Sequence, residues 1–309
     1  MAKYLVTGAA GFIGSVLANY LIQKGNDVIT IDNLTTGSKE NLPKGIEFIQ
    51  GNCQDPEIIK ELNGIKLDAI FHLAGQSSGE ISFDDPVYDL QTNTQSTLLL
   101  LNFAKESGCK KFIYASSMSV YGEQAEQPVN ESATTNPKSF YAIGKLASEQ
   151  YLKIFQDTYG LKTTALRLFN VYGPGQNMEN LRQGMLSIYL SLALKNKNVT
   201  VKGSAERYRD FIYIDDAVTA FTKALEQNSP KFEAYNVACG VKTTVAELIE
   251  NMKTQLPFKF SVEYQENTKG DMFGIYGDNS KIKKELNWEP TIFINKNGMS
   301  KMVEWVLKK

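Results

Sequence analysis

The sequence predicts an α/β protein built on a doubly wound parallel sheet of the Rossmann type. Through the first 168 residues, short apolar runs alternate with helical patterns, the first run leads into a glycine-rich turn, and polar side chains follow several of the runs. Apolar runs of this length are typical of strands buried on both faces, and the helices between them serve as crossovers. Ligands of such sheets bind at the carboxyl ends of the strands, so we expect the functional site there.

The composition excludes several classes of protein. A chain of 309 residues can form one large α/β unit or two closely joined domains. A net charge of -1, with scattered Lys and Arg, argues against a nucleic-acid or membrane partner. Three distant cysteines, an odd number without metal-ligand spacing, indicate reduced residues in a cytoplasmic protein without a metal site. We expect no membrane span and no signal peptide, because the longest leucine run covers only residues 98–101 and the N-terminus enters a strand almost at once.

The start of the chain predicts a strand, a glycine loop and a helix. The strand covers residues 3–7, the loop is Gly8-Ala9-Ala10-Gly11-Phe12-Ile13-Gly14, and the helical spacing is carried by Val16, Leu17, Tyr20 and Leu21. Glycines permit a tight turn and close backbone approach, while a helix N-terminus offers N–H groups and a positive dipole end. These features predict a cradle for a pyrophosphate group.

The second strand, residues 28–31, ends in Asp32. A carboxylate there can accept hydrogen bonds from both hydroxyls of an adenosine ribose, and its charge would repel the extra phosphate of NADP. Asn33 and Leu34 follow in place of an arginine, so NAD is favoured, although Lys39 lies on a loop that could carry it back. The alternative is that Asp32 only caps a turn.

Further strands are expected at 46–50, 69–73, 111–116 and 163–168, and helices at 56–62, up to 107 and around Tyr141. This order places Ala74-Gly75 and Ser116-Ser117 at the carboxyl edge of the sheet and His72 in the core.

After Leu168 the regular alternation stops. A loop at 170–176, a helix at 181–194 and a strand at 211–214 are expected, with Asp215 and Asp216 capping a helix from Ala217. Thr244 and Glu247 form a capping box, and another helix begins near 278–280 and stops near 288–290. We therefore expect residues 1–168 and about 210–236 to form a dinucleotide-binding domain, and residues 169–209 and 237–309 a substrate-binding domain.

Tyr141 and Lys145 lie one turn apart on one helix face and suggest a proton-transfer pair. A nearby ammonium favours the phenolate and should bring the pKa of the phenol into a working range. Ser117, at the end of the preceding strand, could hydrogen-bond the same substrate oxygen. Tyr20 and Lys24 repeat the spacing without such a partner and are interpreted as helix surface. Taken alone, Tyr141 would be interpreted as a core tyrosine beside a solvated lysine, and the glycine loop reverses this preference.

Together these motifs resemble the nucleotide-sugar epimerase/dehydratase group of the extended short-chain dehydrogenases/reductases, and most of all its UDP-hexose 4-epimerases. The resemblance runs nearly end to end and is carried by Gly8/Gly11/Gly14, Asp32-Asn33-Leu34, His72-Leu73-Ala74-Gly75, residues 116–122, Tyr141 with Lys145, residues 166–174 and Arg209-Asp210-Phe211.

The resemblance implies roles for particular residues. Ser117, Tyr141 and Lys145 would be the catalytic triad, and Phe12 and Ile13 would lend backbone N–H groups to the pyrophosphate. The implied NAD-binding residues also include Gly8, Gly11, Gly14, Asp32, Asn33, Asn52, Leu73, Ala74 and Asn93. Asn170, Arg209 and Asp271 would bind the sugar nucleotide. A homodimer is also implied, formed by the long helices at about 90–107 and 140–157.

Three departures from the family pattern bear on the reaction. Met118-Ser119 stands where the dehydratases and decarboxylases carry a carboxylate, so epimerisation is favoured over water elimination. Gly51-Asn52 replaces the usual Gly-Asp at the adenine pocket, and Thr268 replaces a phosphate-binding arginine. Lys269 and Arg182 are the two alternative sources of the missing charge. The expected function is an NAD-dependent nucleotide-sugar epimerase. The alternatives are a keto-sugar reductase and a non-catalytic dinucleotide sensor.

Overall fold

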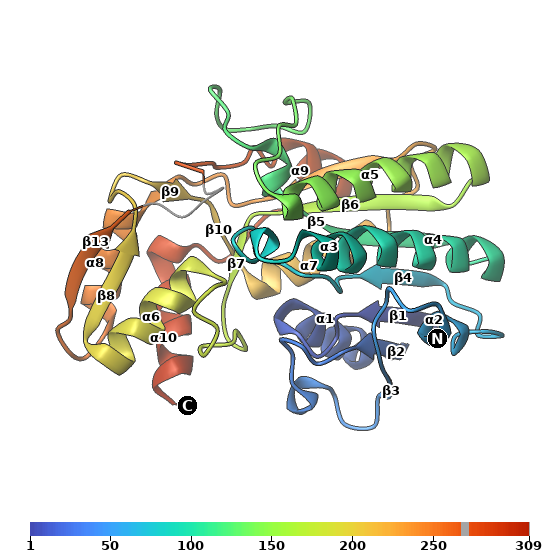
Figure 1. Ribbon diagram of the computed structural model, residues 1–309, viewed down its shortest axis with the longest axis horizontal. Coiled ribbons are helices and arrows are strands. Elements are labelled where there is room, and N and C mark those ends of the chain that lie inside the picture. Colours follow the sequence, from blue (N-terminus) through green and yellow to red (C-terminus); the bar gives the residue numbers. More distant parts are fainter. Residues whose placement is uncertain (267–271, 309) are drawn as a thin grey trace.

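The computed structural model describes residues 1–266 and 272–308 and has a parallel sheet at its centre (Figure 1). The strands are β1 Lys3–Thr7, β2 Asp27–Asp32, β3 Glu47–Gln50, β4 Ala69–His72, β5 Lys111–Ser117, β6 Lys162–Leu168, β7 Asn170–Tyr172, β8 Asn198–Lys202, β9 Tyr208–Arg209, β10 Phe211–Tyr213, β11 Glu233–Val237, β12 Thr243–Thr244 and β13 Ser261–Gln265. The α-helices are α1 Phe12–Gln23, α2 Pro56–Lys60, α3 Pro86–Leu90, α4 Ser96–Ser107, α5 Phe140–Tyr159, α6 Met185–Asn196, α7 Ile214–Ala224, α8 Val245–Gln255, α9 Ser280–Leu286 and α10 Met299–Leu307. Within the described residues, no helix is both long and apolar enough to cross a membrane.

Seven strands form the central sheet in the order β11-β6-β5-β4-β1-β2-β3, and all of their pairings are parallel. The chain builds outward from β1 to β3 and then crosses back to β4 on the other side of β1. This reversal opens a crevice at the carboxyl ends of β1 and β4, where ligands of open parallel sheets bind. The predicted fold class is confirmed.

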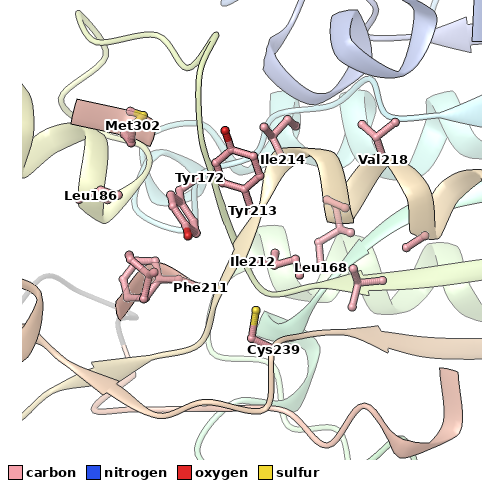
Figure 2. Close-up of a cluster of buried hydrophobic side chains, with 14 of the residues drawn as sticks. Leu168, Tyr172, Leu186, Phe211, Ile212, Tyr213, Ile214, Val218, Cys239 and Met302 are labelled. Atoms are coloured by element: carbon pink, nitrogen blue, oxygen red, sulfur yellow. The ribbon is translucent and has the colours of Figure 1, made fainter. Parts of the chain in front are cut away.

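Alternate residues of the central strands pack into two separate cores, as expected for a sheet covered on both faces. Leu5 and Ile70 face the core that contains residues of α2, α4 and α5, while Val6 and Phe71 face the core that contains α1 and α7. The second of these cores continues beyond the sheet. Figure 2 shows Tyr172, Phe211 and Tyr213 side by side in it, with Leu186 and Met302 joining from α6 and α10.

The smaller part of the molecule is therefore attached to the sheet by shared apolar packing. It contains three two-stranded pairings, namely β10 with β7, β12 with β9 and β13 with β8. In Figure 1 it lies at the left, beside the carboxyl edge of the large sheet. The division into two domains at the predicted boundaries stays a prediction, because one core spans both parts.

Two expectations about helix starts are wrong. The helix expected at 181–194 is α6, which begins at Met185 because the backbone at Gly184 has a φ of +85°. Asp215 and Asp216 lie inside the first turn of α7, whose N-cap is Tyr213, and they do not cap it. The carboxylate of Asp216 instead accepts hydrogen bonds from Thr291 and the backbone N–H of Ile292, and so ties the C-terminal segment to α7. The capping box of Thr244 and Glu247 is present at the start of α8.

The long helix expected to end near residue 107 is interrupted by a π-helical turn, Gln91–Gln95, between α3 and α4. The backbone carbonyl of Asn93 accepts hydrogen bonds from Thr97 Oγ1 at 2.6 Å and from Ser148 Oγ of α5 at 3.1 Å. Side-chain hydroxyls thus bond a carbonyl that an uninterrupted helix would use for its own ladder. The turn packs against α5, which carries Tyr141 and Lys145.

Asp210 joins three segments beneath the site. Its carboxylate is fully buried and accepts hydrogen bonds from the backbone N–H groups of Cys239, Gly240 and Gly277, at 2.8, 2.9 and 3.2 Å. These contacts fix the loop after β11 and the segment before α9 against the start of β10.

We expect Asp210→Ala to lower the free energy of unfolding by at least about 3 kcal/mol, because it leaves three backbone N–H groups, two of them in buried residues, without their acceptor. Urea unfolding followed by circular dichroism measures this. Asp215→Ala is the matched control: its side chain is exposed, and the loss should stay below about 1 kcal/mol. Equal losses of stability in the two variants would contradict the role of Asp210 in joining the three segments.

Candidate active site

The glycine loop after β1 is shaped by close backbone contacts. A Cβ at Gly8, where φ is +71°, would lie 2.8 Å from the backbone nitrogen of Ala74, and a Cβ at Gly14 would lie 2.1 Å from the carbonyl oxygen of Gly8. No side chain fits at either position. Helix α1 then begins at Phe12 with its first-turn N–H groups lacking intrahelical acceptors, and both Phe12 and Ile13 line the cleft described below. This arrangement can bind a pyrophosphate.

Asp32 ends β2 beside this loop. Its carboxylate accepts hydrogen bonds from the backbone N–H groups of Ala10 at 2.9 Å and Leu34 at 2.7 Å, and both Asp32 and Asn33 line the cleft. The expected acidic residue is therefore held next to the cradle. Asn52 does not line the cleft: its Oδ1 accepts a hydrogen bond from Asn33 at 2.8 Å, so the amide oxygen expected to face adenine is already engaged.

Thr7, the last residue of β1, holds the residues that follow β4. Its hydroxyl oxygen accepts hydrogen bonds from the backbone N–H groups of Leu73 and Ala74 at 3.2 and 3.1 Å, and its contact with His72 Nδ1 is 2.8 Å. Burial lowers the pKa of His72 to about 3, so the imidazole is neutral. Leu73 and Ala74 line the cleft as expected, and His72 is a core residue.

Asn93 does not reach the cleft. It is 1% exposed, and its Nδ2 donates to the carbonyl of Gln76 at 2.9 Å and to Asp89 at 3.2 Å. A Cβ at Gly75 would lie 2.5 Å from Asn93 Oδ1, so the side chain sits directly behind the loop that follows β4. The structure thus places Asn93 behind the loop that follows β4, and its role along the cofactor stays a prediction.

A cleft of about 930 Å³ runs from the glycine loop to the smaller part of the molecule. Ser117, Tyr141 and Lys145 all line it, between the cradle and the substrate-binding part. Ser117 is the last residue of β5, and Tyr141 and Lys145 lie on the first two turns of α5, where Ser139 caps the helix by accepting from the backbone N–H of Ala142. The structure thus brings together the three residues expected to form the triad.

The Ser117 hydroxyl oxygen accepts two hydrogen bonds, from the backbone N–H of Ser119 at 3.2 Å and from Ser119 Oγ at 2.9 Å. Its own hydrogen can donate to the Tyr141 oxygen or to a ligand in the cleft. Hydrogen bonding with Ser117 also lowers the pKa of Tyr141. The sequence did not identify Ser119 as part of the site, although it lies two residues after Ser117.

Lys145 was expected to lower the pKa of the Tyr141 phenol, but without a bound cofactor this pKa is raised. Burial raises the pKa of the Tyr141 phenol to about 12. The Lys145 ammonium donates to the carbonyl of Ala115 at 2.9 Å and lies 5.6 Å from the centre of the Tyr141 ring. Burial also lowers the pKa of Lys145 to about 8. Desolvation is the largest cause of both shifts, with Lys145 buried and Tyr141 partly buried.

The substrate end of the cleft is cationic. Asn170 and Arg209 line it as expected, and Arg182, Lys202 and Arg207 line it as well. The last two were not identified from the sequence, because nothing local distinguishes them from other basic residues. Asp271, expected to bind substrate, and Thr268 lie outside the described residues.

Two loops meet across this end of the cleft. Ser78 Oγ donates to the backbone carbonyl of Arg182 at 3.1 Å, and Gln183 Nε2 donates to Ser77 Oγ at 2.6 Å. The Arg182 guanidinium also lies 2.7 Å from the carboxylate of Asp84. The loop after β4 and the loop before α6 are therefore joined over the cleft.

A Rossmann sheet with a glycine cradle, an acidic second strand end and a serine, tyrosine and lysine in one cleft defines a dinucleotide-dependent enzyme of the short-chain dehydrogenase/reductase class. The sequence model described as "NAD dependent epimerase/dehydratase family" matches residues 4–238. The chain belongs to this family.

Individual relatives agree with this placement. A crystal structure of UDP-glucose 4-epimerase from Thermotoga maritima with UDP-glucose is 36% identical, has a TM-score of 0.95 and is matched over 99% of each chain. UDP-glucose 4-epimerase of Mycolicibacterium smegmatis is 33% identical over 99% of each chain. UDP-glucuronic acid decarboxylase 1 of Arabidopsis thaliana is 32% identical over 97% of this chain and 69% of that protein.

The residues present fit NAD, the cofactor of the family. The glycine cradle and the first turn of α1 would hold the pyrophosphate, and Asp32 would hold the adenosine ribose. When bound, NAD supplies a hydride acceptor and a positive charge, which favours the phenolate form of a neighbouring tyrosine. The expectation of an NAD-dependent enzyme of this family is confirmed.

The lowered pKa of Lys145 predicts a pH-dependent stability. Between about pH 8 and 10.5 the unfolded chain binds more protons at this lysine than the folded chain, so the folded protein gains stability as the pH rises. Relative to Lys145→Met, the free energy of unfolding of the unsubstituted protein should increase by about 2 kcal/mol between about pH 7 and 9.5.

Urea unfolding without NAD at the two pH values measures this difference. Lys153→Met, which removes an exposed lysine of the same helix, is the control and should give a difference that does not change with pH. If the difference in free energy of unfolding between the unsubstituted protein and Lys145→Met were also independent of pH, the buried Lys145 ammonium would not be the source of the pH-dependent stability.

Proposed function

We propose that this protein is an NAD-dependent nucleotide-sugar epimerase, acting at C4 of a UDP-hexose through a transient 4-keto sugar. The observation that carries the proposal is the position of Ser117, Tyr141 and Lys145, which lie in one cleft between the dinucleotide cradle and a cationic substrate end. UDP-glucose 4-epimerases among the relatives support the substrate class.

Each of the three residues has a role that its surroundings support. Tyr141 as phenolate takes the proton of the sugar hydroxyl as hydride leaves the sugar carbon. Ser117, whose oxygen already accepts from Ser119, donates its own hydrogen to the same sugar oxygen. Lys145 supplies a positive charge beneath the phenol ring and is held in place by the carbonyl of Ala115. Return of the hydride to the other face of the keto sugar completes the inversion, and Tyr141 returns the proton.

The residues after Ser117 favour epimerisation over dehydration or decarboxylation. Met118 and Ser119 both line the cleft, and neither can act as an acid. Ser119 instead directs its hydroxyl to Ser117 at 2.9 Å. Decarboxylases are also among the relatives, so this position, and not overall similarity, separates the two reactions.

A keto-sugar reductase is the second candidate, because it would use the same three residues. Asp32 weighs against it: the carboxylate lies beside the cradle and would repel the 2′-phosphate of NADPH, which such reductases often use. A non-catalytic dinucleotide sensor is less well supported, because a sensor has no need of a tyrosine, serine and lysine gathered in a cleft.

The test is to incubate the purified protein, without added cofactor, with UDP-glucose, UDP-N-acetylglucosamine, the UDP-uronic acids and GDP-, CDP- and dTDP-sugars, and to follow each by NMR. We expect one UDP-hexose to give its C4 epimer without net reduction of NAD. Oxidation of added NADH or NADPH by a 4-keto sugar, with no epimer formed, would favour the reductase.

Tyr141→Phe should lower the rate of epimerisation at least about 1,000-fold, because the variant lacks the group that exchanges the proton. Its NAD content should be unchanged. Tyr20→Phe is a matched control, since Tyr20 has the same spacing to Lys24 and its ring is 5.4 Å from that ammonium, but it does not line the cleft. A fully active Tyr141→Phe variant would contradict the role of Tyr141 in proton transfer.

We also propose that the protein is a homodimer. It is formed through α5, one of the two helices predicted to pair, and through α3, which directly precedes the other predicted segment, residues 90–107. These two helices pack against each other and expose apolar side chains: Val87 and Leu90 on α3 are 66% and 56% exposed, and Ile143 and Ile154 on α5 are 53% and 55% exposed. Pairing this surface with its copy would remove the apolar groups from water.

Leu90→Asp should convert the dimer to a monomer by placing a charge in the apolar surface. Light scattering with size-exclusion chromatography measures the mass. Leu307→Asp, at a residue of α10 that is 46% exposed, should leave the dimer intact. A monomeric unsubstituted protein at micromolar concentration would refute the proposal.

A further inference from the structure

An ion pair is buried behind the cleft, between the long helix α5 and the strand β6. Glu149 of α5 is 1% exposed and Arg167 of β6 is 6% exposed. Arg167 donates from Nε to Glu149 Oε1 at 2.9 Å and from Nη2 to Glu149 Oε2 at 2.7 Å, so two parallel hydrogen bonds join the side chains. Neither residue lines the cleft, and the proposed reaction makes no direct use of either.

The ion pair is bonded to the strand that ends in Ser117. Ser116 of β5 donates from its hydroxyl to Glu149 Oε1 at 2.5 Å. Ser116 is also the residue directly opposite Arg167 in the register of the two parallel strands. The carboxylate of Glu149 is therefore shared between Arg167 and the residue that precedes Ser117.

Helix α5 has a second bond to the same strand. Lys145, four residues before Glu149 and four after Tyr141, donates to the carbonyl of Ala115 at 2.9 Å. Residues four apart lie on one face of a helix, so Tyr141, Lys145 and Glu149 form one line along α5. In Figure 1, α5 runs beside β5 and β6. The two bonds reach consecutive residues of β5, and together they fix the place of Tyr141 along the strand relative to Ser117.

The other end of the Arg167 guanidinium is bonded to the turn that follows Ser117. Its Nη1 donates to the Tyr121 hydroxyl oxygen at 2.9 Å, and that hydroxyl donates to Asn236 Oδ1 of β11 at 2.6 Å. Tyr121 is the last residue of the 3₁₀ turn Met118–Tyr121 and is fully buried. Ser117 therefore lies between two residues, one before it and one after it in the sequence, that are bonded to this ion pair.

Stability alone does not account for a buried pair of charges. Removing two charges from water is costly, and apolar side chains of similar volume often stabilise a protein equally well. What the pair adds is direction, because a planar guanidinium that donates two parallel hydrogen bonds to a carboxylate fixes its orientation. Accurate placement matters at this site, since Ser117 and Tyr141 must reach the same sugar oxygen, and an error of about 1 Å can slow a reaction about 100-fold.

We propose that Glu149 and Arg167 are positioning residues for the epimerisation. They hold α5 at a fixed place along β5, so that the Tyr141 phenol and the Ser117 hydroxyl reach the same sugar oxygen. This inference rests on the proposed function, because it requires both groups to act on one substrate atom. The pair then affects the rate of the chemical step and leaves the affinities for NAD and substrate unchanged.

The test is steady-state kinetics of the NAD-bound protein with the sugar nucleotide that it epimerises. Glu149→Gln should lower kcat about 10- to 100-fold, because it removes the charge that holds the guanidinium, while KM and NAD content stay within about twofold of the unsubstituted values. Ser116→Ala, which removes one hydroxyl link and keeps the ion pair, should lower kcat about 3- to 10-fold. Glu233→Gln is the matched control: its carboxylate, 12% exposed, lies 2.7 Å from Lys281 Nζ and does not line the cleft, so kcat should not change.

The double variant Glu149→Leu/Arg167→Met separates positioning from stability. Apolar side chains should restore much of the melting temperature that Glu149→Gln loses, because no unpaired charge stays buried. We expect its kcat to remain at least about 10-fold low and its KM to be unchanged. Full kcat in the double variant, or a raised KM with an unchanged kcat in Glu149→Gln, would overturn the inference.

Further outcomes distinguish this inference from the proposed function. Unchanged kcat in Glu149→Gln, in a protein whose unsubstituted form epimerises a sugar nucleotide, would overturn the inference alone. If the double variant does not fold, Ser116→Ala decides, since it keeps the ion pair, and a kcat equal to the unsubstituted value would again overturn the inference. An unsubstituted protein that epimerises no sugar nucleotide would overturn the proposed function and this inference with it.

Discussion

The structure depends on the reversal of strand order beside β1. Parallel strands need long, right-handed crossovers, so the chain can build away from β1 in one direction and must return to build in the other. The two crossovers leave a crevice at the carboxyl ends of β1 and β4. The backbones of Gly8 and Ala74 lie so close together there that a Cβ at Gly8 would be 2.8 Å from the backbone nitrogen of Ala74. The glycine cradle, the end of β2 and the end of β5 all face this crevice, so the site follows from the order of the strands.

The features that could be predicted from the sequence are those with a local cause. The glycine loop, Asp32 and the Tyr141–Lys145 spacing each depend on a few neighbouring residues and one turn of backbone, and the structure places them together. Asn93 could not be placed in this way, because a π-helical turn rotates its side chain inward. Arg207 could not be found either, because its position depends on contacts with residues distant in the sequence.

Burial governs the chemistry of the site as much as the identity of its residues does. The sequence predicted an ammonium that lowers the pKa of a phenol, yet in the protein alone both groups are desolvated and each disfavours its charged form. The same low polarity strengthens every interaction with a charged ligand. The apolar core around Tyr172 and Phe211 contributes to these conditions, because it joins the sheet to the smaller part of the molecule (Figure 2).

The neighbours Arg209 and Asp210 face opposite environments. Arg209 lines the cleft, while Asp210 is buried among backbone N–H groups of two other segments. A deletion of one residue just before them would place the Asp210 carboxylate in the anion site, and an insertion of one residue would place the Arg209 guanidinium among the N–H donors. Length variation in this segment should therefore be far less tolerated during evolution than substitution at its exposed positions, and chimeric proteins made within this family should avoid a junction there.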